Sequence, residues 1–311
     1  MKNKLLITVF FSNLFLTACG SGSNNDNSFQ TKEKIDYAQP ETITLINSLI
    51  FNLSKSTDDN QITDTVSLTN NVYNFVQQAI YRGYQVSCLN RQGTVTQKDN
   101  NVILNKCQGF QYIDNGVAHL VSDSSIILSG TISAQDKERN ELGPQRTLNL
   151  TNLKIEVGNE SFIYNGQVNM PFIWSGLPQE YEVVQMDIKQ TQGNYSEAYK
   201  LTNYHFFRAE NNTPWSSEKQ VTAHSDGRLA GNINGKWFSV NFESKLTFDG
   251  FQNEANAYPS TAEIFIEDSS NLKNYININN TSNNKALIRA YANGNKVTGF
   301  PKIVDWNEFD E

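Results

Sequence analysis

The sequence predicts a mainly β protein: a large antiparallel β-sandwich, or a curved, half-barrel sheet, with a short N-terminal helical segment. After residue 84, apolar and polar residues alternate over long runs, as expected for strands with one buried face. Turn clusters such as 98–101, 158–159 and 293–295 separate these runs at hairpin distances. Charged residues are only 18% of the chain, and abundant Asn, Ser and Thr favour strands and turns over helices.

The first residues are typical of an export signal. Lys2 and Lys4 flank the start of an apolar run, 5–16, which is about 18 Å long as a helix. The hydrocarbon core of a bilayer is about 30 Å thick, so this run is too short to span it. We therefore expect residues 1–18 to be a cleaved signal peptide. Residues 19–38 begin with a run that is poor in apolar side chains, and we expect a flexible tether there.

The run Leu16-Thr17-Ala18-Cys19 resembles the lipobox of bacterial lipoproteins. The resemblance implies cleavage before Cys19 and attachment of acyl chains such as palmitate to that cysteine, which would anchor the protein to a membrane. In that family an Asp after the cysteine usually retains the protein at the inner membrane, whereas this chain has Gly20. The resemblance therefore implies the outer membrane, with the β domain in the periplasm or at the cell surface. The alternative is an ordinary signal peptide with a chance cysteine.

The charge balance limits the expected partners. The 311 residues carry a formal charge of −7, and loss of residues 1–18 removes two lysines and no acid, which leaves −9. We expect no nucleic-acid partner, because phosphate binding needs clustered Lys and Arg and no basic run is present. The lack of a basic run also means that we expect no lasting hold on anionic lipid by the β domain itself. The expected contact with the membrane is instead through Cys19.

Residues 39–83 form the predicted helical lead-in. Apolar residues recur at near-helical intervals in 40–53, where Pro40 suits a first helical turn. A clearer stripe over 69–82 predicts an amphipathic helix, with Asn70 or Asn71 as its N-cap and Gly83 just beyond its end. Such a stripe most often faces the protein's own core, and a partner-binding helix is the alternative.

The remaining residues, 84–311, form the predicted antiparallel β domain. In 146–157 the apolar parity slips, which predicts a bulge or bend at Thr151-Asn152. A weak echo, Gly-x-β-branched residue, recurs at Gly93, Gly130, Gly166 and Gly231. The first three glycines are 37 and 36 residues apart, but the last interval of 65 breaks the period, so the echo is compatible with a repeated unit or with chance. The buried sets expected from alternation are Phe238/Val240/Phe242/Leu246/Phe248, Phe162/Tyr164/Val168/Met170, Ile126/Leu128/Ile132 and Val184/Met186/Ile188.

Cys88 and Cys107 form an even pair in a chain expected to be exported, which predicts a disulfide. Zinc is the weaker alternative, because there is no C-x-x-C and the three histidines lack ligand spacing. In a flat meander of 84–89, 93–97 and 102–107, the outer strands would lie about 9 to 10 Å apart, too far for a disulfide. We therefore expect the first strand to pair directly with the third, or to bend inward at Asn90-Arg91.

A second resemblance is looser. Cys88, the strand end Leu104–Cys107, the Gly93-Thr94-Val95 strand and the terminal Asp305–Phe309 are similar to those of a group of uncharacterised Gram-negative outer-membrane lipoproteins. The chain departs from that group at Lys106, and at Phe309 where Leu is expected. The resemblance implies an all-β lipoprotein and assigns no catalytic residue.

No motif in the sequence indicates catalysis, a metal site or a cofactor. There is no G-x-S-x-G elbow, and three S-x-x-K matches lack the accompanying elements of penicillin-binding enzymes. There is no calcium-loop pattern. Most aromatic residues are expected in the core, and Trp215, which follows Thr213-Pro214, is the candidate for an exposed recognition residue.

These observations favour a non-catalytic outer-membrane lipoprotein that acts as an envelope interaction or structural module. One alternative is a periplasmic carrier of lipid or another hydrophobic ligand, in which a half-barrel encloses a groove. Another is a carbohydrate-binding envelope protein that uses exposed aromatic rings. The expected partners are therefore the membrane, through Cys19, and envelope proteins, lipids or glycans.

Overall fold

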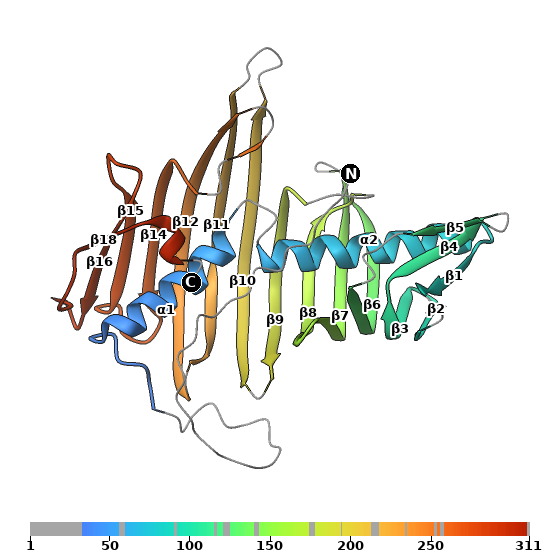
Figure 1. The fold of residues 1–311 in the computed structure, drawn as a ribbon, viewed down its shortest axis with the longest axis horizontal. Coiled ribbons are helices and arrows are strands. Elements are labelled where there is room, and N and C mark those ends of the chain that lie inside the picture. Colours follow the sequence, from blue (N-terminus) through green and yellow to red (C-terminus); the bar gives the residue numbers. More distant parts are fainter. Residues whose placement is uncertain are drawn as a thin grey trace. The chain divides into compact units, whose positions relative to one another are not determined.

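The computed structural model describes residues 33–55, 60–89, 92–114, 117–120, 125–139, 143–173, 178–193, 195–212, 218–233, 235–251, 254–255 and 258–309. Antiparallel strands dominate these residues, and two α-helices lie near the N-terminal end of the sequence (Figure 1). The predicted fold class, a mainly β protein with an N-terminal helical segment, is confirmed. The chain divides into two compact units, which we describe separately.

The first unit comprises residues 60–208 and 225–229, in which helix α2 (Gln61–Tyr81) packs with the N-terminal strands. Its main sheet has the strand order β2-β3-β6-β7-β8-β9-β10, and a small second sheet has the order β1-β4-β5. The strands are β1 (Gln85–Cys88), β2 (Thr94–Lys98), β3 (Asn101–Gln108), β4 (Phe110–Asp114), β5 (Val117–Leu120), β6 (Ile126–Arg139), β7 (Gly143–Val157), β8 (Glu160–Pro171), β9 (Glu180–Gln192) and β10 (Tyr195–Asn212).

The second unit combines α1 (Pro40–Ser54) with the C-terminal strands and the 3-10 helix η3 (Trp306–Phe309). Its sheet runs β11-β12-β14-β15-β16, and β13, β17 and β18 pair with β12, β16 and β16 respectively. The strands are β11 (Glu218–Ile233), β12 (Lys236–Phe251), β13 (Glu254–Ala255), β14 (Thr261–Asp268), β15 (Tyr275–Asn280), β16 (Ala286–Ala292), β17 (Asn295–Lys296) and β18 (Lys302–Val304). The two helices expected in one lead-in therefore belong to different units.

Helix α2 begins earlier than the apolar stripe predicts. The side chain of Asn60 caps it by accepting hydrogen bonds from the backbone N–H groups of Ile62 and Thr63, both at 3.1 Å. The predicted N-caps, Asn70 and Asn71, lie inside the helix, so that prediction is wrong. The first ten residues of α2 are mostly polar, so they show no apolar stripe of helical period. They are buried all the same, because their side chains make hydrogen bonds. The predicted end is correct: Gly83 follows the helix with φ of +75°.

A buried arginine joins α2 to the first sheet. Arg146 of β7 is 3% exposed, and its guanidinium binds Asp136 of β6 at 2.6 and 2.7 Å. Its Nη1 also donates to the side-chain oxygens of Asn70 and Asn74 on α2. The guanidinium lies over the ring of Phe172, 4.5 Å from its centroid. The buried charge is thus paired and hydrogen-bonded, which fixes the position of α2 along the sheet.

Bulges interrupt the first sheet at regular intervals, each facing a glycine on the neighbouring strand. Lys106, Asn152 and Asn203 are bulge residues with φ between +46° and +48°. A Cβ atom built on the facing glycine would lie 2.2 to 2.8 Å from backbone atoms of the partner strand, so only glycine fits. The predicted bend at Thr151-Asn152 is confirmed. The glycine–partner pairs are Gly93–Lys106, Gly130–Asn152, Gly166–Gln185 and Gly227–Tyr204, which we call the glycine seam.

The glycine seam explains two features of the sequence. Gly93, Gly130 and Gly166, whose spacing suggested a repeat, each allow a close backbone approach. The seam also overturns one parity expectation. The register shifts between Gln167 and Val168, which makes Val184 the additional residue of β9. Val184 is therefore 38% exposed, whereas Val183 occupies the buried position.

The core of the second unit is apolar. Ile43, Ile46 and Ile50 of α1 are fully buried, and α1 contacts β12. The predicted inward residues of β12, from Phe238 to Phe248, are also buried. Phe51 of α1 stacks on Trp306 of η3 with ring centroids 5.2 Å apart. Unlike α2, α1 has no side-chain N-cap, and Pro40 occupies its first turn as expected.

The segment before α1 also belongs to the packed body. Lys34 forms a parallel β-bridge with Trp237 at the start of β12, and Ile35 and Tyr37 are buried. These residues precede the expected domain start at residue 39. Among the residues that the structure describes, neither helix is long and apolar enough to span a membrane.

Candidate functional site

Two of the predicted site residues lie outside the described residues. These are Cys19, the expected lipidation site, and Trp215, the candidate recognition aromatic. Both assignments remain predictions.

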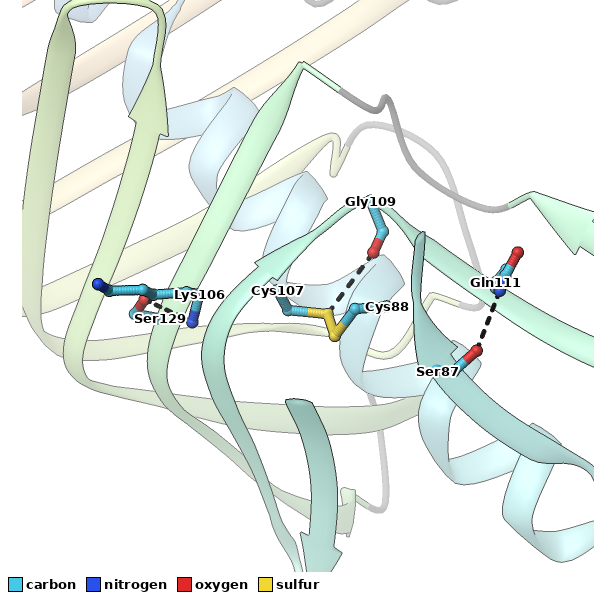
Figure 2. Close-up of a disulfide and its surroundings, with 7 residues drawn as sticks. All are labelled: Ser87, Cys88, Lys106, Cys107, Gly109, Gln111 and Ser129. Carbon is cyan, nitrogen blue, oxygen red and sulfur yellow. Dashed lines mark hydrogen bonds between the residues drawn. A yellow bond between two sulfur atoms is a disulfide. The ribbon is translucent and has the colours of Figure 1, made fainter. Parts of the chain in front are cut away.

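The predicted disulfide between Cys88 and Cys107 is present, with the two Cα atoms 5.2 Å apart (Figure 2). It joins β1 of the small sheet to β3 of the main sheet. The first strand pairs with β4 and not with the third strand, so that alternative is wrong. The flat meander is also excluded, as expected. Gly109, with φ of +58°, separates β3 from β4 and lets the chain turn from one sheet into the other.

Lys106 is the bulge of β3, with φ of +47°. Its backbone N–H donates to Ser129 Oγ at 3.0 Å (Figure 2), and the register shifts between Leu104 and Cys107. The bulge turns Cys107 into the interior, where it is fully buried. The cysteine pair is thus a structural staple, because its sulfur atoms are joined and inaccessible.

The described tryptophans serve packing. Trp306 is buried against α1, and Trp237 is half-buried beneath Lys34, whose Nζ lies 5.2 Å from the ring centroid. Within the described ranges, no three His, Cys, Asp or Glu side chains are grouped as a metal site requires.

A buried tyrosine cluster with raised pKa values lies beneath the first turns of α2. Burial raises the pKa of Tyr164 to about 12 and also raises the pKa of Tyr181 and Tyr204. Gln61 Nε2 donates to the Tyr164 hydroxyl at 3.0 Å, and Thr63 Oγ1 lies 2.8 Å from the Tyr181 hydroxyl. These shifts keep the phenols neutral, and the cluster anchors the helix.

The second sheet presents aromatic rings on its outer face, opposite α1. Phe265 of β14 is 38% exposed, and its ring centroid lies 6.2 Å from that of Tyr275 on β15. Tyr275 stacks directly on Tyr291 of β16, with centroids 4.5 Å apart and ring planes 16° apart. The three rings therefore form a continuous ladder across three strands, which we call the aromatic ladder.

Polar side chains surround the aromatic ladder in rows set by the strand register. One row is Glu243, Phe265, Asn277 and Arg289, and Arg289 Nη1 donates to Asn279 Oδ1 at 3.1 Å. Lys245 binds Glu243 at 2.8 Å and lowers the pKa of that carboxyl. The carboxyl of Glu243 is therefore charged at neutral pH. The arrangement suits hydrogen bonding and ring stacking, and it provides no nucleophile with an adjacent base.

The aromatic ladder was missed at the sequence level because its residues lie on three strands. A signal was nevertheless present on two of the strands: Phe265 and Tyr275 have the opposite parity to the isoleucines of β14 and β15, whereas Tyr291 shares its parity with Leu287 of β16. Ile264 and Ile266 flank Phe265, and both are buried. A large aromatic on the polar parity of a strand indicates an exposed ring.

Comparison with protein-family models, with curated proteins and with solved structures found no match to this chain. The function is therefore argued from its own residues.

Proposed function

We propose that the chain is a non-catalytic lipoprotein of the outer membrane, anchored by acyl chains on Cys19, whose β body is an envelope interaction module. The lipobox-like residues 16–19 support the anchor. The aromatic ladder carries the interaction role, because Phe265 is exposed and the half-buried rings of Tyr275 and Tyr291 continue from it across the regular outer face of the second sheet. Aromatic residues are enriched at protein interfaces.

The experiment places a photo-crosslinking benzoylphenylalanine at position 265 of the mature protein in intact cells. The matched control is the same probe at Val184, which is equally exposed at 38% but lies outside the ladder. We expect discrete crosslinked products from position 265 and few from 184. Equal crosslinking at both positions would contradict the interaction surface. Hydrolysis of an envelope polymer by the purified protein would contradict the non-catalytic assignment.

Glycan binding is the second candidate, favoured by amides placed among the rings. Asn277 and Asn279 lie beside the aromatic ladder on β15, and amides with aromatic faces suit sugar hydroxyls and ring C–H groups. In this case Tyr291→Ala should weaken retention in gels that contain envelope polysaccharide, whereas Ile303→Ala, an exposed residue of β18, should not. Trp215→Ala tests the earlier candidate in the same assay.

The carrier alternative draws no support from the described residues. Helix α1 occupies the apolar face of the second sheet, and α2 occupies that of the first. Ile46, Ile50, Ile62 and Val66 are fully buried on these helices. A half-barrel carrier instead needs an apolar groove that is free for its ligand.

A further inference from the structure

The chain enters the second unit at a defined end of its sheet. Backbone hydrogen bonds join Ile35 N to Trp237 O at 3.0 Å and Trp237 N to Glu33 O at 2.8 Å. Lys34 Nζ donates to Ser270 Oγ at 2.6 Å, in the loop between β14 and β15. We call the segment 33–35, the loop 269–274 and the turn 293–294 the entry end.

Hydrogen bonds hold the loop and the turn of the entry end together. Gly294 N donates to Lys273 O at 2.8 Å, and Asn293 N donates to Asn274 Oδ1 at 2.8 Å. Asn271 Nδ2 also donates to Asn293 Oδ1 at 2.9 Å. Within this bonded frame Leu272 is 64% exposed. The frame therefore presents an aliphatic side chain to solvent, although a loop of this length could place a polar residue there at no cost in packing.

The exposed charges at the entry end are mixed. Lys273 and Lys296 are exposed, and Lys296, two residues after the turn 293–294, lies opposite Tyr291. Glu33 is 76% exposed and lies 3.3 Å from Lys236, and Asp36 is also exposed. Asp268 is buried and accepts hydrogen bonds from Ser270 and Asn274. Glu267 lies on the outer face, opposite Tyr275. An exposed aliphatic residue next to lysines can make a weak contact with phospholipid headgroups, with the side chain at the apolar boundary and the ammonium groups near phosphates.

The short chain between Cys19 and Glu33 favours the bilayer as the partner of the entry end. From Cys19 to Glu33 there are fourteen residue steps, so the anchor and the entry end can be separated by at most about 50 Å in any conformation. A tether of this length gives the entry end a high effective concentration at the bilayer, so that even a weak contact is populated. A weak contact is also all that a body of net negative charge can sustain.

We propose that the entry end docks on the bilayer that holds the acyl chains, with Leu272 at the boundary between headgroups and acyl chains and Lys273 and Lys296 against lipid phosphates. This proposal rests on the lipidation of Cys19. It orients the second sheet with its strands pointing away from the membrane, so that the outer face with the aromatic ladder stays open to a partner.

The opposite end of the sheet supplies a matched control. The turn 281–285 between β15 and β16 is formed by Thr, Ser, two Asn and Lys285, whose Nζ pairs with Asp305 at 3.0 Å. Ser282 in this turn is exposed like Leu272 but lacks an apolar neighbour in the turn.

The experiment uses the mature, lipidated chain in vesicles of phosphatidylethanolamine with a minor share of phosphatidylglycerol. A polarity-sensitive nitrobenzoxadiazole probe is attached through Leu272→Cys or, as control, Ser282→Cys. Cys88 and Cys107 do not compete for the label because they are joined and buried. We expect the probe at position 272 to gain emission and to be quenched by spin-labelled lipid, and the probe at 282 to show neither effect.

A second variant tests the contribution of the Leu272 side chain to docking. A probe at Lys296→Cys should also be quenched, and adding Leu272→Asp should reduce the docked population roughly tenfold, the effect of losing one buried leucine. Lipidated, vesicle-bound protein without quenching at 272, or with stronger quenching at 282, overturns the docking while the anchor stands. Mass spectrometry showing an unmodified Cys19 overturns the anchor, and the docking proposal falls with it.

Discussion

In the first unit helix α2 combines buried apolar residues with directed hydrogen bonds, whereas in the second unit α1 is held mainly by aliphatic and aromatic packing. Asn60, Thr63 and Asn70 of α2 are all buried and bonded to named partners. The core face of α1 contains Ile43, Ile46 and Ile50, and the aromatic rings of η3 cover Phe51. Hydrogen bonds are directional and select one register of helix on sheet, while apolar burial mainly rewards the area removed from water.

The strands of the two units also differ in the regularity of their register. The first is interrupted by the glycine seam, whereas the pairings of β12 with β14, β14 with β15 and β15 with β16 run without a register shift. Bulges bend a sheet and move side chains out of their rows. An uninterrupted register keeps the side chains of neighbouring strands in line, and the aromatic ladder depends on such lines. The bent sheet thus supports a bonded interior, and the regular sheet supports an ordered outer surface.

The largest effect is expected at the buried Arg146. Arg146→Ala removes the donor to the buried side-chain oxygens of Asn70 and Asn74, and the loss of each buried hydrogen bond costs about 1 to 3 kcal/mol. Asp136 also loses its partner, but its side chain is 47% exposed and stays in contact with water. Urea denaturation monitored within the first unit measures the loss in free energy of unfolding. The control, Lys200→Ala, breaks an exposed pair with Asp187 at 3.8 Å and should cost about 0 to 1 kcal/mol. Similar losses for the two variants would argue against a distinct polar interior.

A comparable loss of stability is expected at Phe51, in the apolar core of the second unit. Phe51→Ala removes the ring between Trp306 and Phe309 and should lower the stability of the second unit by about 3 to 5 kcal/mol. Phe51→Leu should restore much of this loss, because burial of area matters more there than directed bonds. Tryptophan fluorescence during denaturation reports the change, and a Leu variant as unstable as the Ala variant would oppose this interpretation.

The glycine seam predicts an intermediate effect. At Gly130, φ is +111° and an added Cβ would lie 2.3 Å from Asn152 O, so Gly130→Ala should cost about 1 to 3 kcal/mol. Gly158 also has positive φ, +58°, but no atom within 4 Å of the added Cβ. Gly158→Ala should therefore cost only about 1 kcal/mol, from backbone strain alone. Thermal denaturation of the two variants separates close approach from strain, and equal midpoints would refute the seam.

Alkaline pH should destabilise the first unit through its buried tyrosines. The pKa of Tyr164 is about 12 in the folded state and about 10 when unfolded, so the folded state retains the proton more strongly. Its contribution is full below pH 10 and is lost as pH rises from 10 through 12, on the order of 2 kcal/mol. In Tyr164→Phe the fall in stability over this window should be shallower. A pH profile identical to that of the wild type would contradict the burial of an ionisable phenol; Asp64 is the nearby charge that also raises its pKa.

The smallest change in stability is expected at the N-termini of the two helices. Asn60→Ala removes the side-chain cap of α2 and should cost about 1 kcal/mol. Gln39, at the corresponding position of α1, makes no cap hydrogen bond, so Gln39→Ala should leave the stability of the second unit nearly unchanged. Equilibrium denaturation of both variants tests whether polar contacts matter more in the first unit.

Periodicity predicted the strands well because burial enforces alternation on a sheet with one covered face. The buried parity of β12 and the bulge at Asn152 could both be deduced from it. The disulfide followed from cysteine counting. The pairing of β1 with β4 could not be foreseen, because strand order depends on contacts between distant segments.

The polar half of α2 escaped the same reasoning for a physical reason. Thr63, Asn70 and Asn74 have no apolar period, and their burial is compensated by partners such as Tyr181 and Arg146 that are distant in sequence. The candidate surface also went unrecognised, since the stacking of Tyr275 on Tyr291 requires the register of two strands. Trp215 was chosen from local context alone and stays a prediction.

The packing of η3 on α1 has a consequence for biogenesis. Asn52 Nδ2 contacts the carbonyl oxygen of Phe309, 257 positions later in the sequence. A chain that is synthesised from its N-terminus presents α1 before the aromatic residues that cover it. Phe51 therefore lacks its stacking partners until residues 306–309 have been made. The packing of α1 in the second unit thus depends on nearly the whole chain being present.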